Sequence, residues 1–340
     1  MEALEAREGD YIETFDGLIC DVKGLVHPGD RVVAFPRFVP DPNGERVRNG
    51  LCFRKVYPLA DRFALLRDRY PEYYRFDRVF GRYMSEIPHE AISRINRPIE
   101  KVPELAKRGH LDSAERDALD FALLLSTSPG LGLDAIGISG SVLVGLHTPQ
   151  SDVDILVYGA RNCLLARRRV EELLDEGREV ERYSEEGLRR LFEFRSQDTA
   201  MSFHDFARLE RRKTIEGTFR RRDFFIRHVK APDEVGEVYG DRTYRPLGRL
   251  AVEATITDDS DSIFTPCSYK VSHVRVVEGP EGVSIAEIVS FRGRFCEQAH
   301  SGERVAASGT LERVEFIDGG AANRLLLGNA REDFMSVVDS

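Results

Sequence analysis

Two aspartates separated by one residue are the feature of this sequence that most directly suggests chemistry. Asp152 and Asp154 flank Val153 in the stretch "SDVDILVYG", which has the composition of a buried strand. Residues i and i+2 of a strand point to the same face, so both carboxylates are expected to project together. Two converging carboxylates repel each other, and a divalent cation with a preference for oxygen ligands removes that repulsion. The pair therefore predicts a metal site for Mg²⁺, or Mn²⁺ in its place.

A glycine and a serine upstream of this pair have the pattern of a phosphate-binding turn. The apolar run "DAIGIS" is broken at Gly140 and Ser141, and an apolar helical turn follows in "SVLVGL". A strand that feeds a helix in this way presents backbone N–H groups, a hydroxyl and the positive end of the helix dipole to one point. Gly140 and Ser141 are thus expected to hold a phosphate of a nucleoside triphosphate (NTP), which the metal at the aspartates would also reach.

The motif as a whole resembles a known signature. Gly140-Ser141, ten further residues, and then Asp152-Val153-Asp154 followed by "ILV" is similar to the signature of the DNA polymerase β-like nucleotidyltransferase superfamily. Within it, the uncharacterised archaeal-type predicted nucleotidyltransferases look closest. The resemblance is specific over about twenty-five residues and extends as a fold over residues 111–230.

The resemblance implies a fold and a reaction. The fold is a mixed sheet flanked by helices. The reaction is transfer of a nucleoside monophosphate (NMP) from an NTP to an acceptor, with two metal ions bound and pyrophosphate leaving. Small molecules, protein side chains and RNA ends remain open as acceptors. A third carboxylate from a later strand is also implied, and it would help to hold metal and activate the acceptor.

Three residues after Asp154 are candidates for the third carboxylate: Asp198, Asp205 and Asp223. Asp223 is favoured, because it opens the strand-like run "DFFIRHV" and would serve as both a catalytic residue and a metal ligand. The alternative is a charged residue that only ends a strand.

A basic segment precedes and includes that run. Residues 205–230 contain nine basic and four acidic side chains. Arg220, Arg221 and Arg222 are expected to face the triphosphate. The alternatives are a solvated helix face or a track for an RNA backbone.

A second class of function stays open beside catalysis. The chain could be a non-catalytic nucleotide- or RNA-binding module that acts through its C-terminal β domain, since a fold does not determine a function. The intact carboxylate pair favours the enzyme. The Walker pattern GxxxxGK[ST] does not occur, so P-loop chemistry is not predicted. His147 is expected to be a solvated loop residue.

The surrounding patterns predict an α+β fold with three regions. Residues 1–60 alternate like strands, and residues 61–235 combine a helical layer with the nucleotidyltransferase domain, whose core is 111–230. Residues 245–330 carry short strands that suggest a small β barrel or sandwich. Helical spacing is expected in "ADRFALLRDRYPEYYRFDRVFGRYM" and in a helix capped by Ser113, with Glu115 in its first turn.

Composition describes an ordinary globular chain. It has 340 residues, 41% hydrophobic and 31% charged, with a net charge of −9 that argues against a nucleic-acid-coated protein. The absence of an N-terminal apolar stretch and of any apolar run near ~18 residues leads to the expectation of a cytoplasmic protein. The five cysteines never form a CxxC pair, so they are expected to be small core residues. The oligomeric state is left open.

Overall fold

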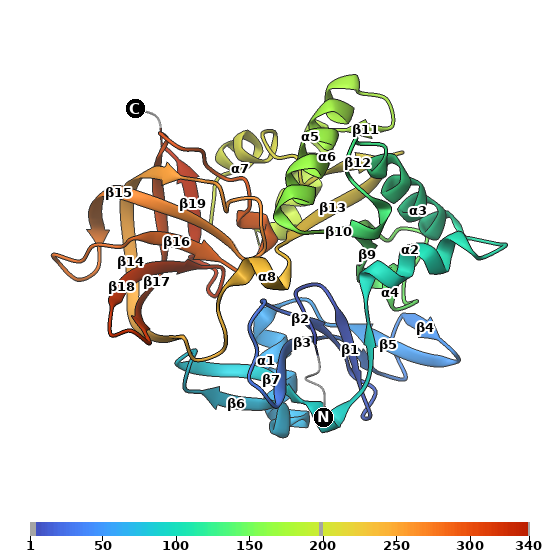
Figure 1. Ribbon diagram of the computed structural model, residues 1–340, viewed down its shortest axis with the longest axis horizontal. Coiled ribbons are helices and arrows are strands. Elements are labelled where there is room, and N and C mark those ends of the chain that lie inside the picture. Colours follow the sequence, from blue (N-terminus) through green and yellow to red (C-terminus); the bar gives the residue numbers. More distant parts are fainter. Residues whose placement is uncertain (1–4, 197–199, 339–340) are drawn as a thin grey trace. The chain divides into compact units, whose positions relative to one another are not determined.

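The computed structural model describes residues 5–196 and 200–338, which form two compact units (Figure 1). The first unit contains Met1–Phe76, Tyr83–Glu181 and Ile215–Val238, and the second contains Asp77–Arg82, Arg182–Thr214 and Tyr239–Ser340. The N-terminal strands and the Gly-Ser and Asp-x-Asp motifs therefore share one unit, while the C-terminal strands lie in the other. The three-region division expected from the sequence stays a prediction.

The helices are short, and most of them follow the apolar spacing of the sequence. The α-helices are α1 (Leu59–Arg69), α2 (Pro98–Ala106), α3 (Ser113–Ser126), α4 (Gly140–Leu143), α5 (Ala160–Glu176), α6 (Glu185–Arg195), α7 (Phe203–Glu210) and α8 (Pro232–Val235). The 3₁₀ turns are η1 (Pro71–Tyr73), η2 (His89–Ala91), η3 (Leu133–Ala135) and η4 (Gly293–Phe295).

The strands fall into three sheets. The strands of the first two sheets are β1 (Tyr11–Thr14), β2 (Ile19–Val22), β3 (Arg31–Pro40), β4 (Arg46–Arg48), β5 (Leu51–Lys55), β6 (Tyr74–Asp77), β7 (Arg82–Pro88), β8 (Ile92–Asn96), β9 (Ile136–Ile138), β10 (Val153–Tyr158), β11 (Val180–Glu181), β12 (Glu216–Phe219) and β13 (Arg222–Val229). Those of the third are β14 (Arg242–Asp258), β15 (Cys267–Glu278), β16 (Glu287–Ser290), β17 (Arg304–Phe316), β18 (Ala321–Leu327) and β19 (Phe334–Val337).

The N-terminal region is a sheet, as its alternating pattern predicts. Its strands lie in the order β4-β5-β3-β2-β1-β8, and β7 pairs with β3 and β6. Buried side chains of β1–β3, such as Ile12 and Val32, pack with Leu65 and Leu66 of α1. A second face of the sheet places Phe38 and Phe53 against Leu146, which follows the Gly-Ser turn. The N-terminal sheet therefore packs directly on the segment that carries the predicted phosphate site.

The helical expectation for residues 60–84 is wrong after Arg69. Helix α1 ends there because Pro71 disfavours the helical conformation of the preceding residue, and Tyr70 indeed has φ −139° and ψ 55°. The following segment, rich in aromatic residues, forms the paired strands β6 and β7 instead. Strands β6 and β7 thus lie between helices α1 and α2 along the chain.

The central sheet of the first unit is mixed, as expected, with strand order β11-β12-β13-β10-β9. Strands β10 and β13 run parallel, and the other pairs are antiparallel. Helices α3 and α5 pack on β10. The ring of Phe121 on α3 lies 4.9 Å from that of Phe219 and 4.8 Å from that of Phe224. This aromatic contact fixes α3 to β12 and β13.

Helix α3 begins one residue earlier than its predicted cap implies. Asp112, and not Ser113, is the N-cap, because its carboxylate accepts hydrogen bonds from the N–H groups of Ala114 and Glu115. The Glu115 side chain accepts in return from the Asp112 N–H, which completes a capping box.

The second unit contains the C-terminal strands with α6 and α7. Its strands pair in the order β14-β15-β16-β18-β17-β19, and β14 also pairs with β17, so the pairings close a ring. Leu188 of α6 and Phe206 of α7 form a small buried cluster of their own. Both helices belong to the stretch predicted as part of the nucleotidyltransferase domain, yet they cluster with the C-terminal strands.

Replacing Asp112 with alanine should lower the free energy of unfolding by about 1 kcal/mol, because two N–H groups at the start of α3 lose their acceptor. Ser113→Ala is the matched control and should change stability by no more than a few tenths of that. Chemical denaturation of both variants beside wild type measures the difference. Equal losses in the two variants would contradict the capping assignment.

Candidate functional site

Strand β10 holds the aspartate pair as the alternating pattern predicts. Val153 is fully buried, whereas Asp152 is exposed and Asp154 is half-buried. The parallel register with β13 aligns Asp154 with Phe225, and Val153 with Phe224. Both carboxylates therefore leave the sheet on the face opposite to α3, with Asp152 just before the strand begins.

Gly140 lies against Asp154 so closely that no other residue fits between them. Its φ is +61°, a left-handed conformation that favours glycine, and a Cβ there would overlap the Asp154 carboxylate. The backbone N–H of Ser139 donates to the Asp154 carbonyl oxygen at 2.8 Å. The two predicted motifs thus meet at one point, with the Gly-Ser turn beside the Asp154 carboxylate.

The Ser141 hydroxyl is buried and forms no hydrogen bond within the described residues. Ser141 is only 4% exposed, and its Oγ has no hydrogen-bond partner among the described residues. A buried hydroxyl without a partner costs free energy unless another group supplies the bond. The helix that follows, α4, is only four residues long, so its dipole contributes less than the sequence pattern suggested. The hydroxyl and the turn geometry carry the phosphate hypothesis.

Burial and charge both act on Asp154. Desolvation by burial, followed by repulsion from Asp152, raises the pKa of Asp154 to about 7. Arg227, Lys55 and Arg37 lower it, but their effect is smaller. The carboxylate is therefore held in a place that disfavours its own charge, which is the expected state of a cation ligand without its cation.

Of the three candidates for a third carboxylate, Asp223 lies on the strand next to the aspartate pair, although the ligand atoms of Asp152, Asp154 and Asp223 do not all lie within 4.8 Å of one another. It lies one residue before Phe224 on β13, and Phe224 is aligned with Val153, so Asp223 continues the register beside Asp152. Asp205 instead lies in the first turn of α7 in the second unit and accepts from the Ser202 hydroxyl. Asp198 falls outside the described residues. The role of Asp223 stays a prediction.

The predicted phosphate-binding arginines occupy the hairpin before Asp223. Arg220 and Arg221 both have positive φ, at 50° and 69°, and form the two-residue turn between β12 and β13. Arg220 is paired with Asp120 and Glu179, each at 2.6 Å. Arg221 is exposed and forms no ion pair within the part of the chain that the structure describes.

Arg222 binds the loop that leads to the aspartates. Its guanidinium donates to the carbonyl oxygens of Pro149 and Ser151 at 2.7 and 2.8 Å, and to the Asp117 carboxylate at 2.8 Å. These bonds fix the backbone immediately before Asp152. Contact of Arg220, Arg221 and Arg222 with a phosphate stays a prediction.

The rest of the basic segment is largely neutralised by ion pairs. Arg212 pairs with Glu303 at 2.8 Å, and Lys213 pairs with Glu210 at 2.8 Å. Arg211 pairs with Glu185. The local positive charge of the sequence is therefore offset by acids from other segments, and a continuous basic track for RNA gains no support from these residues.

A group of metal-ligating side chains lies next to the Gly-Ser loop. Asp112, Glu115 and His147 have potential ligand atoms within 4.8 Å of one another, and no other such group of three occurs among residues 5–196 and 200–338. The two carboxylates already accept the bonds of the capping box, and His147 Nε2 lies 2.7 Å from Asp112. The expectation of a solvated His147 is wrong, because its side chain is 13% exposed and ties the loop to α3.

A small cavity of about 30 Å³ lies beside Asp154, and the N-terminal sheet forms part of its wall. The residues that line it are Tyr11, Asp21, Arg37, Ser139, Gly140, Asp154, Ile155, Leu156, Phe225 and Arg227. Arg227 donates to Glu8 at 2.8 Å and lies 3.6 Å from Asp21. Sequence reasoning missed the N-terminal members because they are far away along the chain. Arg227 carried a signal, since it interrupts the apolar run "FFIRHV".

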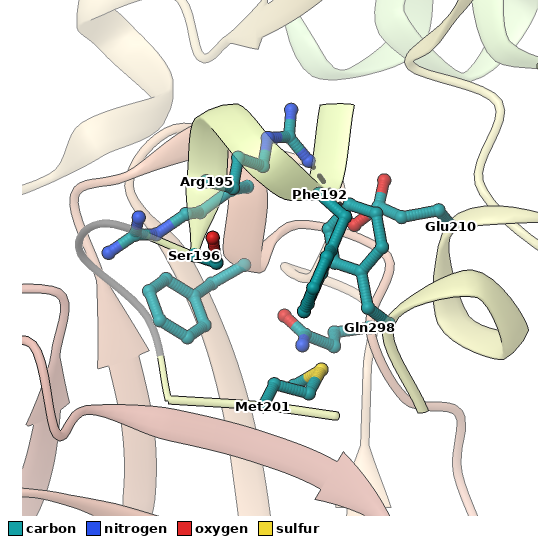
Figure 2. A pocket seen from close by; sticks show the side chains of 9 residues that line it. Phe192, Arg195, Ser196, Met201, Glu210 and Gln298 are labelled. Atoms are coloured by element: carbon teal, nitrogen blue, oxygen red, sulfur yellow. Dashed lines mark ion pairs between the residues drawn. The ribbon is translucent and has the colours of Figure 1, made fainter. Parts of the chain in front are cut away.

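The second unit has a cavity of its own, which Figure 2 shows with Phe192, Met201 and Gln298 around it. Its volume is about 20 Å³, and an ion pair of 3.2 Å between Arg195 and Glu210 closes one side. This volume holds about one water molecule. Neither the aspartate pair nor the Gly-Ser turn lines this cavity.

The cysteines agree with the expectation of small core residues. The five cysteines are free thiols, four of them buried and Cys52 partly so. Within the described ranges, no helix has both the length and the apolar character needed to cross a membrane.

Comparison with known proteins confirms the predicted resemblance for part of the chain. Residues 128–218 match the family model of the nucleotidyltransferase domain. This range contains the Gly-Ser turn and the Asp-x-Asp pair, and it ends before Arg220 and Asp223. No solved structure matches the chain.

The terminal β regions are also found in a relative. An uncharacterised protein of Methanocaldococcus jannaschii, MJ1086, is 28% identical over 343 residues, which cover 98% of this chain and 99% of the relative. The similarity thus includes the N-terminal sheet and the C-terminal strands as well as the central motif.

Replacing Asp154 with asparagine should stabilise the metal-free protein at alkaline pH. The pKa of Asp154 is about 7 in the fold, and that of an ordinary aspartate is 3.8. Between these two pH values the folded state therefore retains a proton that the unfolded state has lost. Its contribution to stability is therefore unfavourable above pH 7 and absent below about pH 4. We expect Asp154→Asn to raise the free energy of unfolding by at least about 1 kcal/mol at pH 8 and by almost nothing at pH 4.

Chemical denaturation in the presence of a chelator measures this difference at the two pH values. Added Mg²⁺ should then stabilise wild type but not the variant. An equal effect of the substitution at both pH values would contradict the burial of a charged Asp154.

Proposed function

We propose that this chain is a metal-dependent nucleotidyltransferase that moves an NMP from an NTP to an acceptor and releases pyrophosphate. The match of residues 128–218 to the nucleotidyltransferase domain supports the reaction class. The observation that carries the proposal is the contact of Gly140 with the Asp154 carboxylate, because it brings a phosphate-binding turn and a metal-binding pair to one point. Either motif alone has ordinary structural explanations.

The residues at this point fit a divalent cation and a triphosphate. Asp152 and Asp154 supply carboxylate oxygens, which Mg²⁺ and Mn²⁺ prefer. Asp223 is proposed as the third ligand, and two ions would share the three carboxylates. When bound, the cation neutralises charge on the α-phosphate and on the departing pyrophosphate. The Ser141 hydroxyl, buried without a partner, is placed to donate to a phosphate oxygen.

The chain's own residues then position the reacting groups. An acceptor oxygen forms a bond to the α-phosphorus while the bond from that phosphorus to the bridging oxygen of pyrophosphate breaks. The deprotonated carboxylate of Asp223 would act as the general base, taking the proton from the acceptor hydroxyl when the acceptor approaches along β13. Arg222 keeps the backbone before Asp152 in place through two carbonyl bonds.

The turn before Asp223 supports a role for its arginines. Two-residue hairpin turns with positive φ at both positions favour Asn-Gly, so arginine at both positions carries a conformational cost. Exposed Arg221 is the member best suited to meet a phosphate, since Arg220 is already paired with two acids. The acceptor is a small molecule, a protein side chain or an RNA end, and the ring of strands at residues 245–330 is interpreted as a small β barrel.

Incubation with each α-³²P-labelled NTP tests the proposal. The reaction contains Mg²⁺ or Mn²⁺ and one of several acceptors: pooled small molecules, the protein itself and total RNA. Label that moves to any acceptor supports the transferase. Binding of NTP without transfer to any of them would favour the alternative of a non-catalytic binding module.

Asp152→Asn and Asp154→Asn should each reduce the rate of label transfer at least ~100-fold, because each removes charge that stabilises the transition state. Asp134→Asn provides a matched control, as Asp134 is an exposed aspartate of the same unit. Melting temperatures of all three variants establish that they are folded. Near wild-type activity in either site variant would refute the assignment of the carboxylate pair.

Ser141→Ala should weaken NTP binding about fivefold to tenfold, as expected for the loss of one hydroxyl contact worth about 1 kcal/mol. Gly140→Ala should have a larger effect, because the added Cβ displaces the Asp154 carboxylate and the left-handed φ disfavours alanine. Calorimetric titration with a non-hydrolysable NTP measures both. Unchanged affinity in the two variants would show that the turn does not hold phosphate.

A further inference from the structure

The N-terminal sheet provides a second wall for the proposed nucleotide site. Tyr11, Asp21 and Arg37 of β1–β3 line the same cavity as Gly140 and Asp154. The wall is held in place by β4, where Arg46 donates to the Leu146 carbonyl oxygen at 3.0 Å and Arg48 donates to that of Val144 at 3.0 Å. Residues outside the match to the nucleotidyltransferase domain are therefore fixed beside the carboxylate pair.

Two cations on this wall lack an acidic partner. In the described part of the chain, neither Arg37 nor Lys55 forms an ion pair with a carboxylate within 4.0 Å. Both side chains are half-buried, and both lie over the ring of Tyr57, at 4.3 Å for the Arg37 guanidinium and 5.4 Å for the Lys55 ammonium. Burial lowers the pKa of Arg37, but Tyr57, Tyr11 and Asp21 together raise it, so the guanidinium is charged. Two positive charges thus lie near each other on this wall, and an anion bound between them would reduce their repulsion.

Their charges also reach the aspartate pair. Burial and then the charge of Arg37 lower the pKa of Lys55, while Asp152 and Asp154 oppose this effect. Arg37 and Lys55 in turn lower the pKa of Asp154 against its burial. Arg37 lines the cavity that Asp154 also lines, and Lys55 lies over the same Tyr57 ring as Arg37, so both cations belong to this wall of the site.

Arg227 in the same cavity behaves differently. It is neutralised by Glu8 at 2.8 Å and Asp21 at 3.6 Å, both from the N-terminal region. Glu8 also pairs with Lys23 at 3.2 Å, and Asp21 pairs with Lys23 at 2.8 Å. Those charges form a closed structural network. Arg37 and Lys55 are not part of this ion-pair network.

We infer that Arg37 and Lys55 of the N-terminal sheet bind the β- and γ-phosphates of the NTP and hold the pyrophosphate as it leaves. This inference rests on the proposed function, since it assigns the ligand to the same site. Guanidinium groups bind phosphate oxygens in pairs, and an ammonium group adds a compact charge with three donors. The N-terminal sheet is then an essential half of the nucleotide site rather than a separate accessory domain.

Binding of inorganic tripolyphosphate in the presence of Mg²⁺ tests the inference without any transfer reaction. Isothermal titration calorimetry compares wild type with Arg37→Gln and Lys55→Gln. Each variant should bind at least about 10-fold more weakly, because each loses charge-assisted hydrogen bonds. Arg54→Gln is the matched control on the same strand, where Arg54 is exposed and pairs with Asp41 at 3.1 Å, and it should bind as wild type does.

Stability provides a readout that separates binding from a structural role. The glutamine variants should stay folded in phosphate-free buffer, and tripolyphosphate should raise their melting temperatures less than that of wild type. If a glutamine variant fails to fold, Arg37→Lys and Lys55→Arg replace it and should retain most of the affinity. Unchanged affinity in both folded glutamine variants, or no binding of tripolyphosphate to wild type, would overturn the inference.

The two proposals fail in different ways. Transfer of label in the radioactive assay, together with tripolyphosphate affinity that is unchanged in the Arg37 and Lys55 variants, would refute this inference. The proposed nucleotidyltransferase activity would then still be supported. Binding of tripolyphosphate that depends on both residues, without transfer to any acceptor, would support the anion site and refute the enzyme.

Discussion

The first unit depends on the accommodation of one half-buried carboxylate, that of Asp154. Burial and the neighbouring Asp152 both oppose its charge, and they raise its pKa to about 7. A fold tolerates such a group only where surrounding structure fixes it. Here the backbone of Asp154 is bonded to Ser139 and paired with β13, while its side chain lies against a glycine. A larger residue at Gly140 would remove the space that the carboxylate needs.

The loop between the two motifs is hydrogen-bonded from both sides, and these bonds keep the Gly-Ser turn and the carboxylates at fixed positions relative to each other. Arg222 of β13 binds the carbonyl oxygens of Pro149 and Ser151 on one side. Arg46 of β4 binds Leu146 and the Ser151 hydroxyl on the other. These bonds satisfy backbone carbonyls that the loop cannot satisfy itself. Arginine suits this task because its planar group donates to several acceptors at once.

Local features of the candidate site could be predicted from sequence because they depend on short-range geometry. The two-residue period of a strand determines that Asp152 and Asp154 share a face, and Val153 is buried as that period requires. The run from Asp223 to Val229 reads as a strand for the same reason and forms β13. The cap of α3 was assigned one residue late, since Asp112 and Ser113 are both good caps and only the acceptor geometry distinguishes them.

The rest could not be predicted because it arises from contacts between distant segments. Aromatic spacing after Arg69 fits a helix or a strand equally well, and the pairing of β7 with β3 decides between them. The compensation of charge is equally non-local. Residues 205–230 are strongly basic as a segment, but their partners include Glu303 and Asp117.

The same non-local pairing determines which cations of the N-terminal wall remain available. Glu8 and Asp21 neutralise Lys23 and Arg227, so these four residues hold the N-terminal sheet against β13. Among the described residues Arg37 and Lys55 form no ion pair within 4.0 Å, and both lie over the ring of Tyr57. The sheet is attached to β13 through these paired charges. Arg37 and Lys55 lie outside the pairs and give the wall an excess of positive charge beside the aspartates. A sheet that served only as a structural cover would have no need of that excess, because apolar side chains of similar volume would pack there at lower cost.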